Sequence, residues 1–159
     1  MDKPIIPPEK DVLVDIKDTE ENLRRTRIPN GPDRVIGNFI FIINITAPRK
    51  DLYVPLSVAS GKKPTGFVYQ IEGTAQSSIL KTDISCRGEN ITQVALGTIV
   101  YCKIPTGMTA AFRIRIETRG QVGKLYKIVI RQIRYKLNPL DARYQILLEN
   151  LETKMLKFS

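Results

Sequence analysis

The fold is decided by residues 109–136, which read TAAFRIRIETRGQVGKLYKIVIRQIRYK. In both halves of this stretch apolar side chains alternate with polar or charged ones, which is the two-residue period of a strand with one buried face. Residues 119–123, between the two halves, contain two glycines and suit a loop. The stretch therefore predicts a β-hairpin in which Ile114 faces Ile128, with all the apolar pairs on one buried side.

The chain around this hairpin repeats the pattern. It has 159 residues, about the size of one domain, and turn residues divide its middle into seven predicted strands. These are Arg34–Thr46, Leu52–Val58, Gly66–Glu72, Ser78–Cys86, Thr92–Ile104, Thr109–Thr118 and Lys124–Lys136. Short strands without intervening helices favour an all-β fold, a single antiparallel β-sandwich. Seven strands suit an immunoglobulin-like sandwich and eight, with one more near Val12, suit a jelly roll; the sequence leaves both open.

Residues 1–33 differ from this body. They contain five of the ten prolines and eight of the sixteen acidic residues. Because proline bars helix interiors and central strands, we expect a mostly extended N-terminal arm. Val12, Val14 and Ile16 alternate along it and predict one short strand, through which the arm would dock. Residues 19–25 suit a single helical turn.

The C-terminal segment has a different period. Its apolar residues recur at steps of three and four positions: Leu140, Tyr144, Leu147, Leu148, Leu151 and Met155. This spacing is typical of an amphipathic helix of about four turns. We expect this helix to dock through Leu147, Leu151 and Met155, on its own sheet edge or on a partner. The chain thus divides into an arm at 1–33, a β-sandwich at 34–138 and a C-terminal helix at 139–159.

Positive charge is concentrated in the body. The formal net charge is +9, and residues 103–136 hold nine basic residues against Glu117 alone. The predicted hairpin places Arg115 opposite Lys127 on its polar side, and like charges so placed are destabilising. Either these long side chains spread into solvent, or the face binds phosphates, carboxylates or acidic side chains. Its residues are Arg113, Arg115, Arg119, Lys124, Lys127 and Arg131.

The chain has two cysteines, Cys86 and Cys102, and no histidine. Strand alternation points both cysteines inward, so they are candidates for a disulfide that would stabilise the fold by about 3 kcal/mol. Two buried free thiols are the alternative. Without histidine, Ser-His and Cys-His catalysis and imidazole-ligated metal sites are excluded. We expect neither a metal nor a cofactor.

No catalytic pattern is visible in the body. Its acidic residues are scattered: Asp51, Glu72, Asp83, Glu89 and Glu117. We therefore expect a protein that is not an enzyme. A hydrolase acting through such carboxylates is a third hypothesis, after the two given in the next paragraph. The longest apolar run, within residues 35–45, is far shorter than the roughly 20 residues of a membrane helix, so we expect no transmembrane segment.

The layout of arm, body and tail is typical of a subunit that holds its neighbours by its ends. We expect a structural subunit of a homo- or hetero-oligomer, first a virion capsid or spike-base component and second a cell-surface fibre or layer subunit. Both settings place the chain at a virion or cell surface rather than in a cytoplasmic enzyme pool. The alternative is a monomeric β-sandwich module that binds a polyanion, such as a phosphorylated glycan or, non-specifically, nucleic acid.

Overall fold

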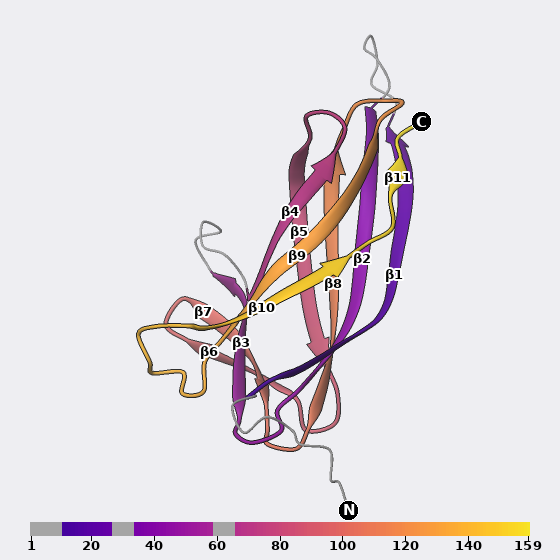
Figure 1. Ribbon diagram of the computed structural model, residues 1–159. Coiled ribbons are helices and arrows are strands. Elements are labelled where there is room, and N and C mark those ends of the chain that lie inside the picture. Colours follow the sequence, from indigo (N-terminus) through magenta and orange to yellow (C-terminus); the bar gives the residue numbers. More distant parts are fainter. Residues whose placement is uncertain (1–10, 27–33, 59–65) are drawn as a thin grey trace, which may run out of the picture.

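The computed structural model describes residues 11–26, 34–58 and 66–159, and over these residues the chain forms strands and no helix (Figure 1). The strands are β1 (Leu13–Thr26), β2 (Arg34–Thr46), β3 (Leu52–Val58), β4 (Phe67–Gly73), β5 (Ser78–Arg87), β6 (Thr92–Leu96), β7 (Ile99–Ile104), β8 (Thr109–Arg119), β9 (Leu125–Tyr135), β10 (Gln145–Glu152) and β11 (Leu156–Lys157). All their pairings are antiparallel. The all-β class predicted from the alternation is confirmed.

The strands form three sheets, which we call sheets A, B and C. Sheet A has the order β1-β2-β8-β5, and sheet B has the order β3-β7-β6. In sheet C, β9 pairs with β4 along one edge and with β10 and β11 along the other. The long strands of sheets A and C lie over one another and sheet B lies at one end (Figure 1). The arrangement is consistent with a β-sandwich; the jelly-roll and immunoglobulin-like strand orders stay predictions.

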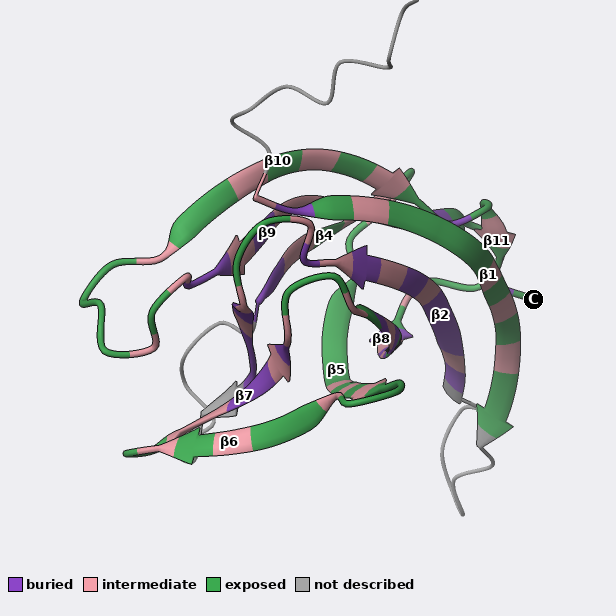
Figure 2. Cartoon of the chain, turned by 90° about the horizontal axis from the view of Figure 1, so that it is seen from below, coloured by how far each residue is buried: buried purple, intermediate pink, exposed green. Residues whose placement is uncertain are grey.

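The core lies between sheets A and C. Alternate residues of β2, β8 and β9 point into it and are fully buried: Phe39, Phe41, Ile43, Phe112, Ile114, Ile116, Tyr126, Ile128 and Ile130. Phe67 of β4 and Phe112 of β8 meet across the core with ring centroids 5.4 Å apart. Burial of each such side chain contributes about 1.5–3 kcal/mol to folding. Figure 2 shows the contrast between the largely buried β2 and the edge strands β5, β6 and β10, which are mostly exposed.

Residues 120–124 carry the chain from sheet A to sheet C, so the predicted hairpin is wrong. β8 pairs with β2 and β5, whereas β9 pairs with β4, β10 and β11. Ile114 and Ile128 are both in the core, as predicted, but they come from opposite layers. Alternation reports which face of a strand is buried and does not identify the neighbouring strand. Arg115 and Lys127 therefore lie on opposite outer faces, and the predicted repulsion between them is absent.

Tyr126 holds this crossing against the core. Its hydroxyl accepts a hydrogen bond from the Gln121 N–H (2.9 Å) and donates one to the Gln76 carbonyl (3.1 Å). Gly120 lies over the Tyr126 ring, where an added Cβ would approach the ring to 2.5 Å and Phe158 to 2.8 Å. Only glycine allows the backbone to come so close.

The strand of the N-terminal segment is an integral part of sheet A. β1 pairs with β2 from Leu13↔Thr46 to Thr26↔Arg34, with one bulge between Ile16 and Asp18. The helical turn predicted over residues 19–25 is wrong, because this segment pairs with the 13-residue β2 and gains its backbone hydrogen bonds there. The rest of the predicted arm, residues 1–10 and 27–33, lies outside the described residues.

The three residues predicted to dock the arm lie at the start of this strand. Val12 is buried in the core, Val14 packs against the core, and Ile16 is exposed. The contacts of Val12 and Val14 are therefore made with the chain's own body.

The C-terminal helix predicted over residues 139–159 is wrong, since β10 and β11 occupy that segment and both pair with β9. Leu147 and Leu151 pack against the core, whereas Met155 is exposed. Residues four apart share a side in a strand as well as in a helix, so the spacing of these two leucines fits both. The free edge of β9 supplies backbone partners for a strand, and this decides the outcome.

The remaining strands were predicted closely. β2 and β3 have the predicted bounds, β5 and β8 are one residue longer at the C-terminal end, and β4 and β9 differ by one residue at each end. The exception is the strand predicted over Thr92–Ile104, which is two strands, β6 and β7. Gly97 lies between them with φ +61°, a left-handed conformation that glycine adopts readily.

Candidate functional site

The outer face of sheet A carries three columns of side chains with different chemistry. The pairing register places Asp18 of β1 and Arg113 of β8 on either side of Ile42 of β2, and Glu20 and Arg115 on either side of Ile40. We call this surface the striped face. Its main residues are acidic on β1 (Asp15, Asp18, Glu20), apolar on β2 (Ile36, Ile40, Ile42) and basic on β8 (Arg113, Arg115, Arg119). Each column also holds an exception on this face: Arg24 on β1, Asn38 on β2 and Glu117 on β8.

The acidic and basic columns are only partly neutralised within the chain. Side chains can bridge β2, since the Arg24 guanidinium on β1 lies 3.9 Å from the Glu117 carboxylate on β8. Asp18, Glu20 and Arg113 form no ion pair with any residue that the structure describes. The face therefore presents unpaired charges of opposite sign at fixed positions.

Other charges on the same face are paired locally. The Arg115 guanidinium lies 2.7 Å from the Glu117 carboxylate and also donates a hydrogen bond to Asn38 Oδ1 (3.3 Å). Asp15 lies 2.8 Å from the ammonium of Lys17. The Asp15–Lys17 pair is largely exposed and contributes only about 0–1 kcal/mol to stability, whereas the Arg115–Glu117 pair is partly buried.

The apolar column is partly shielded by its neighbours. Ile40 is 5% exposed although it does not belong to the core between the sheets. Ile36 and Ile42 are half-buried. Long flanking side chains can cover an apolar strip with their aliphatic parts while their charged ends reach solvent. This combination of an apolar strip and flanking charges resembles the make-up of a protein–protein contact more than that of a polyanion site.

A hollow of about 300 Å³ opens on the striped face beside Arg113. Its lining residues are Ile42, Ser85, Arg87, Ala111, Phe112 and Arg113. The small side chains of Ser85 and Ala111 leave this space between the strands. Two arginines at its rim favour an acidic side chain as its occupant.

The six basic residues predicted to form one patch are distributed over two sheets and a loop. Arg113, Arg115 and Arg119 lie on β8 in sheet A, whereas Lys127 and Arg131 lie on β9 in sheet C and Lys124 is an exposed loop residue.

The basic residues of β9 are already paired with acidic and amide groups. The Lys127 ammonium lies 3.3 Å from the Glu152 carboxylate and 3.9 Å from that of Glu72. Arg131 pairs with Glu72 and donates a hydrogen bond to Asn150 Oδ1 (2.8 Å). On the outer face of β9, the positive charges of Lys127 and Arg131 are therefore largely balanced by the carboxylates of Glu72 and Glu152.

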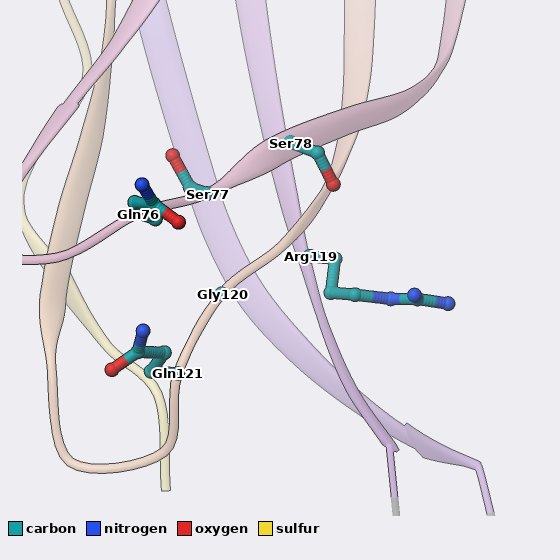
Figure 3. A pocket seen from close by; sticks show the side chains of 6 residues that line it. All are labelled: Gln76, Ser77, Ser78, Arg119, Gly120 and Gln121. Atoms are coloured by element: carbon teal, nitrogen blue, oxygen red, sulfur yellow. The ribbon is translucent and has the colours of Figure 1, made fainter.

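A second hollow, of about 310 Å³, lies at the sheet crossing and is lined by Gln76, Ser77, Ser78, Arg119, Gly120 and Gln121. Figure 3 shows the Arg119 side chain extending away from Gln76 and Gln121. The hollow therefore lacks the convergent polar groups that characterise a ligand site.

A lysine–tyrosine cluster joins sheet B to the loop before β10. The Lys136 ammonium lies 4.6 Å from the ring centroid of Tyr144 and 5.7 Å from that of Tyr101, in a buried position. Burial and a hydrogen bond with Tyr101 raise the pKa of Tyr144 above its ordinary value. Cation–π contacts of this kind stabilise by about 0.5–2 kcal/mol. We assign the cluster a structural role, since its groups already satisfy one another.

Asp51 fixes the loop between β7 and β8. Its Oδ1 accepts hydrogen bonds from the Thr106 N–H (2.8 Å) and the Thr106 hydroxyl (2.9 Å). These two bonds lower the pKa of the Asp51 carboxyl below its ordinary value. The carboxylate thus serves as a loop tether.

Cys86 of β5 and Cys102 of β7 form a disulfide that joins sheet A to sheet B, with Cα atoms 6.4 Å apart. Cys102 is fully buried. No cysteine in the chain is left as a free thiol.

Two parts of the striped face were not predicted from the sequence: the acidic residues of β1 and the outward isoleucines of β2. Asp18 and Glu20 were assigned to an arm, although β1 brings them onto the same face as the arginines of β8. The outward Ile40 and Ile42 lie in a continuous apolar run, residues 39–43, in which no alternation is visible. Asp18 and Glu20 are two positions apart, and this spacing is the sequence feature that could have placed them on one face of a strand.

The carboxylates of the described residues form no cluster that could bind a metal ion. In residues 11–26, 34–58 and 66–159, no group of three or more Cys, Asp or Glu side chains is placed to hold a metal ion. Over the same ranges no helix is long and apolar enough to span a bilayer. Comparison with protein-family models, curated proteins and solved structures finds no match to the chain.

Proposed function

We propose that this protein is a non-catalytic structural subunit that binds other protein chains through the striped face. The observation that carries the proposal is the apolar column of β2 between the acidic and basic columns, in which Asp18, Glu20 and Arg113 have no ion-pair partner among the described residues. Apolar area excludes water at a contact, while fixed charges select the partner and set its register. A virion or a cell-surface layer is the setting that we propose for such a subunit.

The proposed contact differs from the one that the sequence suggested. The arm strand and the C-terminal strands of the described chain pair with β2 and β9 of their own body, so the argument from free ends no longer supports assembly. Removing residues 1–30 would delete β1 from sheet A and expose the edge of β2. Such a deletion would test folding rather than assembly.

Polyanion binding is the second candidate, favoured by the net charge of +9. Lys81, Arg87, Arg113 and Arg119 lie on β5 and β8 and supply its positive groups. Asp83 and Glu117 are interspersed among them, and such acids weaken a phosphate-binding surface.

Light scattering over a range of concentrations tests the proposed function. We expect the molar mass to rise above the 18.0 kDa of one chain as the concentration increases. A mass that stays at one chain, together with salt-dependent retention on heparin, would replace assembly by polyanion binding.

A further inference from the structure

We propose that the partner on the striped face is a second copy of this chain, related by a two-fold axis that runs along β2. The inference rests on the proposed function and specifies its partner. It follows from the order of the three columns, acidic on β1, apolar on β2 and basic on β8.

The column order is self-complementary under this symmetry. Rotation by half a turn about an axis along β2 brings the second copy face to face with the first and exchanges the two sides of β2. The acidic column of each copy then lies over the basic column of the other, and the half-buried Ile42 of one copy meets Ile42 of the other, above the already buried Ile40. A two-fold axis across the strands at the level of Phe41 would instead place β1 over β1, with Asp18 of one copy against Glu20 of the other. The charges therefore select the axis along β2.

The register identifies the contacts at the centre. A rotation about β2 keeps each residue at its own level along the strand. Asp18 shares its level with Ile42 and Arg113, and Glu20 shares its level with Ile40 and Arg115. Asp18 of one copy thus faces Arg113 of the other, and Glu20 faces Arg115. Both contacts occur twice in the dimer.

The hollow beside Arg113 fits this arrangement. Its rim carries Arg87 and Arg113, and it lies at the level of the β1 bulge between Ile16 and Asp18. In the dimer the bulged segment of one copy therefore approaches the hollow of the other. The Asp18 carboxylate can then meet two arginines.

One like-charge pair limits the extent of the contact. Arg24 and Arg119 share the level of Ile36, so a fully aligned dimer would oppose them. Sheets that pack face to face cross at about 30°, so their columns superpose at the centre and separate toward the ends. We therefore place the centre at Ile40 and Ile42, with Ile36 toward the diverging end.

The area of the overlap suits a weak, reversible dimer. With the axis along β2, three strands of each copy overlap, β1, β2 and β8. They span about 14 Å, and the length of β8 is about 36 Å, which gives about 500 Å² for each copy. Specific contacts bury about 800 Å² for each partner and weak, transient ones bury less.

Charge reversal with mixing tests the axis. In a homodimer of Asp18→Arg, the positive charge at position 18 faces Arg113 of the other copy. In a homodimer of Arg113→Asp, the negative charge at position 113 faces Asp18 of the other copy. Each variant alone therefore places like charges together at two sites, and we expect the dimer dissociation constant to rise at least about tenfold. An equimolar mixture restores opposite charges at both sites, so we expect it to form a heterodimer with an affinity close to the parent's.

Sedimentation velocity of the full chain is the measurement, and circular dichroism verifies that each variant folds. Asp141→Arg and Arg143→Asp make the same charge changes in the exposed loop before β10 and should leave the dimer unchanged. An oligomer that both single reversals leave intact overturns the two-fold pairing but not the proposed function. A wild-type mass of one chain at every concentration overturns both. Single variants that dissociate and do not recover on mixing also contradict the axis along β2.

Discussion

Asp18 and Arg113 lie on opposite flanks of Ile42, each one strand away from it and two strands away from each other. Neither residue forms an ion pair with any residue that the structure describes, so both charges stay available to a partner. The arrangement depends on the position of β2 between β1 and β8, and it exists only because β8 joins sheet A rather than pairing with β9. Sheet topology thus determines the chemistry of the face.

Neighbouring isoleucines of β2 should respond differently to truncation. Ile43→Ala leaves a cavity in the core and should lower the free energy of unfolding by about 2–5 kcal/mol. Ile42→Ala, on the striped face, should cost no more than about 1 kcal/mol and should instead weaken self-association. Urea denaturation at low protein concentration separates the two effects. Equal losses of stability would contradict the assignment of Ile42 to the outer face.

Phe158 should be essential for stability although it follows the last strand. It is fully buried, with its ring centroid 4.8 Å from that of Tyr126. We expect Phe158→Ala to lower the free energy of unfolding by about 3–5 kcal/mol. The matched control is Met155→Ala, at an exposed position, which should change stability by about 0.5 kcal/mol or less. Similar thermal midpoints for the two variants would show that the C-terminal segment does not pack on the core.

Reduction of the disulfide should destabilise the fold without unfolding it. The bridge joins residues 16 positions apart, and closing a loop of this length is worth about 3 kcal/mol. We expect a reducing agent to shift the urea midpoint of the parent protein downward. A variant carrying Cys86→Ala and Cys102→Ala should show no such response, and a shift of the same size in that variant would point to another cause.

Asp51 should make stability fall in acid. Because the Thr106 hydrogen bonds lower its folded-state pKa below the ordinary 3.8, its contribution is present above that value and is lost as pH falls through the folded pKa. Asp51→Asn should be less stable than the parent at neutral pH, and the difference should shrink below about pH 4. Thr106→Val keeps the backbone donor and should have a smaller effect. Unfolding curves at several pH values measure this, and a pH-independent difference would contradict it.

The sequence predicted strand positions well and strand partners poorly. Residues 34–46 were assigned correctly because local alternation and flanking turn residues define a strand without knowledge of its neighbours. Ile114 and Ile128 were placed on a buried face correctly and in the wrong sheet, because pairing depends on contacts distant in sequence. Leu147 and Leu151 fit both helix and strand, and only the free edge of β9 decides between them.

The candidate site was predictable only in its basic half. Arg113 and Arg115 stand out by alternation within β8. Asp18 and Glu20 lie more than 90 residues earlier in a segment with weak strand preference, and nothing local links the two groups. The register of β1 on β2 and of β2 on β8 brings them together.

The crossing at residues 120–124 also couples the two main layers during folding. Sheet A is complete only when β8 is in place, and sheet C only when β9 is, yet a five-residue connection joins these strands. Neither layer can separate far from the other without pulling on a strand of its neighbour. We expect the two layers to melt in a single cooperative step, with slow amide exchange in β8 and β9 reporting the same opening event.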